Sequence, residues 1–381
     1  MQDIFLPSTL IYDSEFDINS LRQNKPYRNI GQLLMSMKSV RNALRLCGAE
    51  ERILDGTASD FECFYAICSS MEYLAGHNVY NGVKRLLEDV FGVYEQLSPF
   101  NCEELWESLN SFIDDNGLTP ISLLNLLNVE SLSVRVSPFD DFEIEAGEID
   151  LYSVTDLSDI VSLVTSDNNT ENDLESFVNK ISLAISDRAE QGSFSVYFAL
   201  GNDYEFERMS RKHEIYEIYT SLKQKKCVSD SEKNGLITYV LTSLFGTFRA
   251  KNCNALTDIS CKTRELRRLL DYLRLNKKLP TSLIIRSDDP KNVTDIALEF
   301  SFRNEYGLPS VIPICPCTKE LARVFPIGLA LEYQSGITDA VSVAALISSR
   351  EESYQALSLI SDPDSLLLDL AYANIKNRMR I

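Results

Sequence analysis

No stretch of this 381-residue sequence approaches the roughly 18 consecutive apolar residues that a membrane-spanning helix needs. The N-terminus, Met1–Phe5, lacks the basic flank of a secretory signal. Basic residues are also few, because 37 Lys and Arg stand against 56 Asp and Glu, for a formal net charge of −19. Nucleic acids and anionic membranes are bound through basic patches, which disfavours both as partners. We therefore expect a cytoplasmic protein with no nucleic-acid or membrane partner.

Cysteine is present but without the spacing of a disulfide scaffold. The chain has nine cysteines, an odd number in a long sequence, which predicts reduced and mostly buried thiols. Cys315 and Cys317 are the one suggestive pair. A single residue between them is too short for the usual zinc knuckle, and no second Cys or His pair is near. We expect no metal there.

Apolar and charged residues make up 44% and 24% of the chain, as in an ordinary globular protein with a large core. Strand patterns alternate with helical ones, which predicts a parallel sheet. The length and the number of units favour a closed (β/α)8 barrel over an open sheet. The expected strands are Leu10–Tyr12, Ser131–Val136, Ser193–Leu200, Leu283–Ile285 and Val341–Ser348, with a further strand end at Leu244–Gly246.

Residues 27–116 carry a helical pattern without strands. Val83, Leu86, Leu87 and Val90 recur at spacings of three and four, which places them on one helix face. A new helix is expected after Thr119, with Pro120 at its first position. The predicted organisation is a barrel of residues 1–26 and 117–381 with an all-helical insertion, residues 27–116, after the first strand.

Several segments, in order along nearly the whole chain, resemble one known family. Asn42–Asp60 resembles its Arg-Ala-Met-Arg-x-x-Gly-Val-x-Glu-x-x-Ile-Thr-Gly segment, Ser137–Asp141 its Asp-Asp-Pro-x-Asp element, and Tyr372–Lys376 its Tyr-Asn-Asn-Ala-Lys. The ordered set resembles the uronate isomerases of the amidohydrolase superfamily. The resemblance implies an amidohydrolase-type barrel, interconversion of aldo- and keto-uronates, and a site at the carboxyl ends of the strands.

The family is similar to other amidohydrolases in holding a divalent metal with His-x-His after strand 1, further histidines and a strand-8 Asp. This chain has two histidines, His77 and His213, far apart and without ligand-spaced partners. The family's Ser-Asp-His, Gln-Leu-His-Ile-Gly and Leu-Thr-Asp-Ser-Arg match Val196–Phe198, Ser243–Gly246 and Leu346–Arg350. The former metal positions would then be Ser14, Phe16, Phe198, Leu244 and Ser348. We therefore expect no metal and no other cofactor.

Some cationic positions of the family are kept. Arg45, Arg249 and Arg350 match its arginines, and a guanidinium can pair with a carboxylate through two parallel hydrogen bonds. They are candidates for binding a uronate or another small acid; the alternative is that they are ordinary surface arginines. Asp13, Glu15 and Asp17 near the end of strand 1 would suit a hard cation, or a solvated strand end.

Three functions follow from this pattern. The first is a catalytically silent relative (a pseudoenzyme) that is kept for binding or assembly, with itself or with an active relative. The second is an active isomerase with a metal-independent site, using Glu15 or Tyr197 as base. The third is a binding protein for acidic sugars, or a scaffold. Phe16, Phe198 and Leu244 would fill the former site if it has closed.

Overall fold

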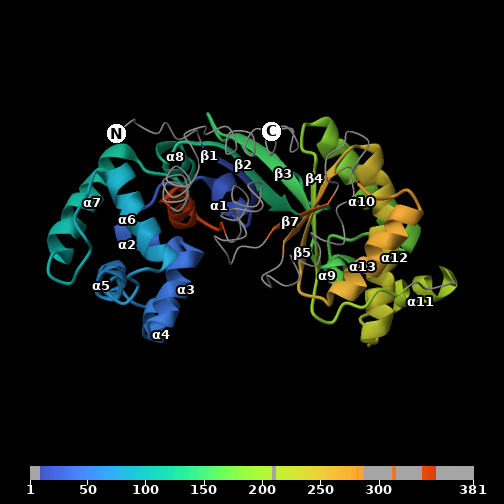
Figure 1. Cartoon of the computed structure of the whole chain (residues 1–381). Helices are drawn as coiled ribbons and strands as arrows, with labels where there is room; N and C mark the ends of the chain where they lie inside the picture. Colours follow the sequence, from blue (N-terminus) through green and yellow to red (C-terminus); the bar gives the residue numbers. More distant parts are fainter. Residues whose placement is uncertain (1–8, 208–211, 281, 287–310, 315–336, 349–381) are drawn as a thin grey trace, which may run out of the picture. The chain divides into compact units, whose positions relative to one another are not determined.

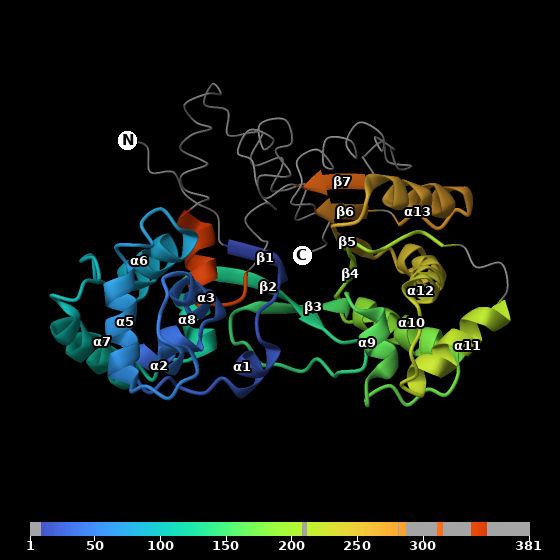
Figure 2. The ribbon, with the colours of Figure 1, turned by 90° about the horizontal axis from the view of Figure 1, so that it is seen from below.

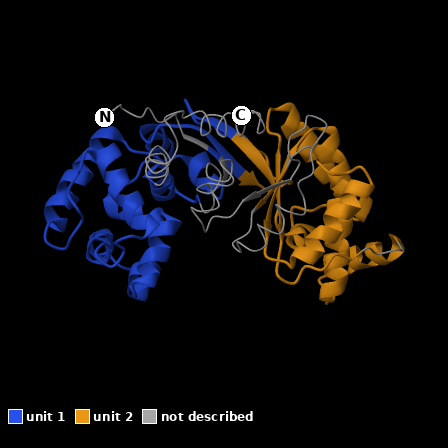
Figure 3. Cartoon of the chain, in the orientation of Figure 1, with its two compact units in different colours: residues 1–134, 143–151, 333–365 blue, residues 135–142, 152–332, 366–381 orange. Residues whose placement is uncertain are grey.

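The computed structural model describes residues 9–207, 212–280, 282–286, 311–314 and 337–348 (Figure 1). The chain divides into two compact units (Figure 3). Unit 1 comprises residues 1–134, 143–151 and 333–365, and unit 2 comprises residues 135–142, 152–332 and 366–381. No helix in the described ranges is long and apolar enough to span a membrane.

Unit 1 contains β1 (Thr9–Ser14) and all but the last two residues of β2 (Val129–Val136), and the two strands pair in parallel. Only helices lie between them in sequence: α1 (Ile18–Gln23), α2 (Ile30–Ser36), α3 (Lys38–Leu46), α4 (Glu51–Leu54), α5 (Asp60–Ser70), α6 (Asn78–Phe91), α7 (Cys102–Asn116) and α8 (Pro120–Leu126). The predicted all-helical insertion after strand 1 is thereby confirmed. Residues 27–116 share unit 1 with β1, and their separation as a subdomain stays a prediction.

Local signals fix several of these helices. Thr119 caps α8 and Pro120 stands at its start, as the sequence predicts. Gly82 of α6 lies against the backbone of Val341, where an added Cβ would come within 2.2 Å of the carbonyl oxygen. Only glycine fits this approach between α6 and the helix formed by residues 340–348.

Unit 2 is built on five parallel strands in the order β3 (Asp150–Leu157), β4 (Ser195–Leu200), β5 (Asn254–Ile259), β6 (Ser282–Arg286) and β7 (Val311–Ile314). Its helices are α9 (Ile160–Thr165), α10 (Leu174–Glu190), α11 (Lys212–Lys223), α12 (Asp230–Ala250) and α13 (Thr263–Leu275). Helices α9, α10, α12 and α13 run alongside the strands (Figures 1 and 2).

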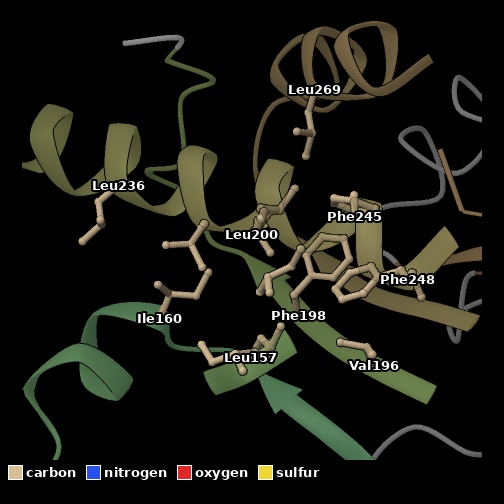
Figure 4. Packing of buried hydrophobic residues seen from close by; sticks show 14 of the residues in the cluster. Leu157, Ile160, Val196, Phe198, Leu200, Leu236, Phe245, Phe248 and Leu269 are labelled. Carbon is tan, nitrogen blue, oxygen red and sulfur yellow. The ribbon is translucent and has the colours of Figure 1, made fainter. Parts of the chain in front are cut away.

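The core of unit 2 lies between its strands and these helices (Figure 4). Val196, Phe198 and Leu200 alternate along β4 and all belong to it. Since side chains alternate between the faces of a strand, Tyr197 and Ala199 point to the other face. Each strand of unit 2 thus has a helix-side face and an opposite face, and this distinction decides which residues can form a site.

Two predicted strands are wrong. Leu244–Gly246 lies inside α12, and residues 340–348 are helical. Both segments are largely buried and therefore almost entirely apolar. A short apolar segment of this kind has the same composition in a buried strand and in a buried helix, so the sequence pattern does not distinguish the two. The predicted strands around residues 10, 131, 195 and 284 are confirmed.

Candidate functional site

The two positions expected after strand 1 are occupied by packing groups. Ser14 is fully buried, and its hydroxyl donates to the carbonyl of Ser133 at 2.7 Å. Phe16 is buried. A zinc-like ion prefers a pair of imidazole ligands at these positions. The Ser14 hydroxyl is already bonded to the neighbouring strand, and the Phe16 ring has no ligand atom, so the two residues do not replace that pair.

Phe198 and Leu244 lie on the helix side of unit 2. The Phe198 ring packs edge-on against Phe245 of α12, with 5.6 Å between ring centroids (Figure 4). Leu244 is fully buried in the middle of the same helix, in the same core. Leu244 was matched to a histidine at the end of a predicted strand. Because this segment is helical, that match is not supported. Phe198 and Leu244 both lie in the core on the helix side of the sheet. They therefore take no part in a site on the other face.

The strand-8 aspartate also needs correcting. Ser348 lies near the end of the helix of residues 340–348, so its match to that aspartate rested on a strand that is absent. Ile337-Thr338-Asp339, just before this helix, fits the family's Leu-Thr-Asp better. The signal was in the sequence, because Thr and Asp are both retained there.

Asp339 is nevertheless fully engaged within the protein. Asp339 is 6% exposed, and its carboxylate accepts five hydrogen bonds, three at Oδ1 and two at Oδ2, which occupy all of its lone-pair sites. The donors are the backbone N–H and hydroxyl of Ser39, the backbone N–H and hydroxyl of Ser342, and the hydroxyl of Thr338, at 2.8 to 3.0 Å.

These donors come from two helix N-termini. Ser39 is in the first turn of α3, whose own N-cap residue, Met37, makes no side-chain cap bond. Ser342 is in the first turn of the helix that Asp339 itself precedes. A negative charge is favourable at each N-terminus, where backbone N–H groups lack helical partners. Asp339 is therefore a shared cap, and it leaves no lone pair for a metal ion.

The arginines matched to the family are spread along the chain. Arg45 is exposed on α3 and donates to Asn42 at 3.2 Å. Arg249 is exposed in the last turn of α12 and donates to the carbonyl of Lys277 at 2.6 Å. The end of α12 leads into the start of β5, so Arg249 belongs to the amino ends of the strands and not to their carboxyl ends. Arg350 lies outside the described residues.

The remaining candidates of the sequence have local roles. Asp17 caps α1, and Glu15 lies 3.9 Å from the ammonium group of Lys38. His77 is the N-cap of α6, where its Nδ1 accepts from the backbone N–H of Val79 at 3.2 Å. His213 is exposed on α11. Nothing is described of the Asp13 side chain, and Cys315 and Cys317 lie outside the described residues.

The structure instead brings polar residues together on the opposite sheet face of unit 2. The Tyr197 hydroxyl donates to the Asp258 carboxylate at 2.9 Å. The Arg135 guanidinium lies over the Tyr197 ring, 3.5 Å from its centroid, in a cation–π contact. Asp156 on β3 is the register partner of Tyr197 and shares its face. The sequence indicated only Tyr197 here.

Arg188 of α10 fixes the chain where β2 ends. This buried guanidinium donates to the carbonyls of Val136, Ser137 and Asp140 and to the hydroxyl of Thr155, at 2.7 to 3.2 Å. Burial lowers its pKa to about 10, which leaves it charged near neutral pH. Arg188 thereby holds the segment that follows Arg135.

Uronate isomerases are among the known proteins that match this chain. Residues 8–150 match the model of the glucuronate isomerase family. The chain is 35% identical over 99 residues to a uronate isomerase of Clostridium perfringens, covering 26% of this chain and 21% of that protein. It is 28% identical over 133 residues to one of Clostridium acetobutylicum, covering 35% and 28%. The aligned part spans less than a third of the length of either relative.

The whole chain matches solved structures of the same kind. The uronate isomerase of Thermotoga maritima superposes with a TM-score of 0.77 at 14% identity, covering 96% of this chain and 92% of that one. The glucuronate isomerase of Caulobacter crescentus gives 0.74 at 13% identity, covering 99% and 91%. The fold is therefore the amidohydrolase-type (β/α)8 barrel, as the sequence predicts. Within that class, the chain is similar to the glucuronate isomerase family over residues 8–150.

Proposed function

We propose that this chain does not carry out metal-dependent uronate isomerisation and acts through binding or assembly instead. The observation that carries the proposal is the shared cap at Asp339. The best match to a metal-binding aspartate spends its carboxylate on two helix N-termini, with five donors at 2.8 to 3.0 Å. To bind a metal, it would have to release hydrogen bonds from both helices.

The other matched positions support the same conclusion. Aldose–ketose isomerisation moves a proton between adjacent carbons and needs a base together with a group that polarises the carbonyl. Ser14 is bonded to Ser133, and Phe198 and Leu244 are core residues. His77 precedes α6 as its N-cap and His213 lies on α11, so neither histidine of the chain lies at a strand end. The metal does not fit these residues, and no step is assigned to it.

An isomerase assay tests the proposal. The full chain is incubated with D-glucuronate and D-galacturonate, each with added zinc, manganese, magnesium or cobalt, beside the Thermotoga maritima uronate isomerase as positive control. We expect turnover no higher than in a protein-free blank under every condition. Turnover within about a thousandfold of the control enzyme, equivalent to about 4 kcal/mol of barrel-site stabilisation, contradicts the proposal.

The alternatives remain separable by the same assay. A metal-independent isomerase would turn over uronates equally well in a further arm of the assay that contains chelator in place of added metal. Self-association, or association with an active relative, belongs to the assembly part of the proposal. Light scattering of the pure chain, alone and mixed with an active uronate isomerase, measures it directly. The cytoplasmic location stays a prediction.

A further inference from the structure

We infer that a second copy of this chain docks on unit 1 by seating its Phe100 ring in a surface pocket between the end of α3 and the start of α6. This inference rests on the assembly role in the proposed function, and it names the surface and the partner for that role. The pocket has a volume of about 370 Å³ and is lined by Leu46, Cys47, Tyr73, Leu74 and His77.

The walls of this pocket are held by backbone hydrogen bonds. Leu46 and Cys47 stand at the end of α3, and the Cys47 N–H donates to the last turn of that helix. Tyr73 and Leu74 lie in the turn between α5 and α6, where the His77 N–H donates to the Leu74 carbonyl at 2.8 Å. The pocket is therefore formed before a partner arrives, so that binding does not have to order it.

The pocket lies away from the former metal position at Asp339. Asp339 caps the first turn of α3 through Ser39, whereas Cys47 follows the last turn of the same helix. An α-helix rises 1.5 Å per residue, so the step from Ser39 to Cys47 spans about 12 Å along its axis. The site that the family resemblance implies therefore does not account for the pocket.

The rim of the pocket is apolar and open to solvent. Leu46 is 77% exposed and Tyr73 is 81% exposed, whereas Leu74 below them is buried. Single exposed apolar side chains are common, but two that flank one pocket mark an interaction site. The group that fits between them is itself apolar.

Phe100 supplies such a group on a rigid loop. Its ring is 100% exposed. The Ser98 N–H and hydroxyl both donate to Oδ1 of Asn101 at 2.9 Å, and the Asn101 amide donates to the Gln96 carbonyl at 3.0 Å. Leu97 is buried and anchors the loop. An aromatic ring that is already held in place loses little conformational freedom when it enters a pocket, and such rings dominate many interfaces.

The surroundings of the Phe100 ring are acidic. Residues 86–134 contain no lysine, arginine or histidine. Glu95, Glu103 and Glu104 are exposed close to Phe100 in this stretch. The ring is therefore presented from a negatively charged surface.

One wall of the pocket carries the opposite charge. Helix α3 has three basic residues and no acidic one, and the exposed Arg45 stands directly before Leu46 at its end. Glu72 on the other wall opposes this charge in part. Opposite charges around a pocket and its occupant favour the correct orientation of two copies, and salt weakens their attraction.

Light scattering of the full chain over about 5 to 500 µM tests the inference. One ring in one pocket makes a small contact, so we expect the average mass to rise above 43.1 kDa with a dissociation constant of about 10–100 µM. At the few micromolar of an unfolding experiment the chain is then a monomer. Phe100→Ser and Leu46→Asp should each weaken the association by about tenfold or more. Tyr94→Ser, at an exposed ring of the same loop, is the matched control and should leave it unchanged.

A mixture of the two variants tests whether the ring enters the pocket. Phe100→Ser keeps the pocket intact, and Leu46→Asp keeps the ring intact. We expect an equimolar mixture to associate at concentrations where each variant alone stays at 43.1 kDa. A mixture that stays monomeric while the wild type associates overturns the inference.

Cys47 reports on the pocket from inside, because it is half-buried and lines it. Its rate of modification by a maleimide should fall as the protein concentration rises through the dissociation constant, whereas the rate of the exposed Cys227 should stay constant. In Phe100→Ser neither rate should depend on concentration. A constant Cys47 rate in a wild type that associates shows that another surface is used, which also overturns the inference.

Leu46 and Phe100 are both exposed, so the variants should fold, and melting curves at about 5 µM check this. A wild type that stays at 43.1 kDa up to about 500 µM overturns the inference without bearing on isomerase turnover. Uronate turnover would contradict the proposed function whatever the mass. The two failures are therefore distinguishable.

Discussion

The side chain of Asp339 accepts hydrogen bonds from both the backbone N–H and the hydroxyl of Ser39, at 2.9 and 2.8 Å, across 300 positions of sequence. The same carboxylate caps the helix of residues 340–348 through Ser342. One charge therefore ties the start of α3, in the helical insertion, to the start of a helix near the far end of the chain. Asp339 therefore has a structural role, whereas the family resemblance associates an aspartate in this motif with metal binding.

Replacing this carboxylate should destabilise unit 1. Asp339→Ala removes two helix caps at once, each worth about 1 kcal/mol, and leaves the half-buried Ser39 donors without this acceptor. We expect the free energy of unfolding to fall by about 2–4 kcal/mol in urea titrations. Asp173→Ala, which removes the cap of α10 alone, is the control and should lose about 1 kcal/mol. Equal losses in the two variants would mean that the second cap contributes nothing.

Phe198 is a core residue and should behave as one. Phe198→Ala is expected to lower the free energy of unfolding by about 3–5 kcal/mol, as large-to-small substitutions of buried aromatic residues do. Phe100→Ala, at a fully exposed ring, should change it by less than about 0.5 kcal/mol. A further variant, Phe198→His, should destabilise the fold without creating zinc affinity. Zinc binding by that variant would show that position 198 does face a metal site.

The cysteines should divide by burial. All seven described cysteines are free, as predicted, and five are buried, while Cys47 is half-buried and Cys227 exposed. Burial raises the pKa of Cys68 to about 12 and that of Cys261 to about 11, which leaves little reactive thiolate. In a Cys315→Ser/Cys317→Ser background, Ellman's reagent should label Cys227 fast and Cys47 more slowly. Rapid labelling of more than two thiols in the native protein contradicts this arrangement.

Acid should weaken the capping box of α5. Hydrogen bonds from the Ser59 backbone and from Arg52 lower the pKa of Glu62 to about 2, from an ordinary 4.5. A lowered pKa stabilises the folded state above the unfolded pKa, and this stabilisation is lost as the pH falls through the folded pKa. Glu62→Gln should therefore lower the melting temperature at pH 7, and the difference should shrink from about pH 4.5 towards pH 2.

The exposed Glu72 supplies the control for this pH series. Glu72→Gln should change the melting temperature little at either end of the range. A Glu62→Gln difference that stays constant between pH 7 and pH 3 would show that Glu62 does not titrate as its contacts require.

Much of the fold follows from the sequence, because alternation and helical spacing are local signals. The strand over Ser195–Leu200, the helices between β1 and β2, and the Thr119 cap were all predictable from a few neighbouring residues. Leu244–Gly246 and residues 341–348 were not, since a helix that is buried on several sides loses its polar stripe. The helical character of the second run is signalled only by Asp339, which precedes it as a cap.

The site was harder to predict than the fold. Short motif matches predicted that Phe198 and Leu244 stand at metal positions. Whether a strand residue points towards the helices or to the other side of the sheet depends on where the helices pack, which a short motif does not show. Asp156 and Asp258 come together with Tyr197 only when β3, β4 and β5 are aligned in parallel register. Both aspartates share one signal, because each stands one place before the end of a buried strand. The sequence alone does not fix the strand ends, so this signal could not be recognised in it.

Metal binding by the purified chain tests the central claim most directly. The protein is treated with chelator, dialysed against excess zinc or manganese, freed of loose ions, and analysed for metal by mass spectrometry beside the Asp339→Ala variant. A structural zinc site would retain its ion under these conditions. Because we propose that the chain has no such site, we expect less than about 0.1 metal ion per chain in both proteins. About one ion per chain in the wild type, lost in Asp339→Ala, would show that Asp339 is still a metal ligand and would contradict this account.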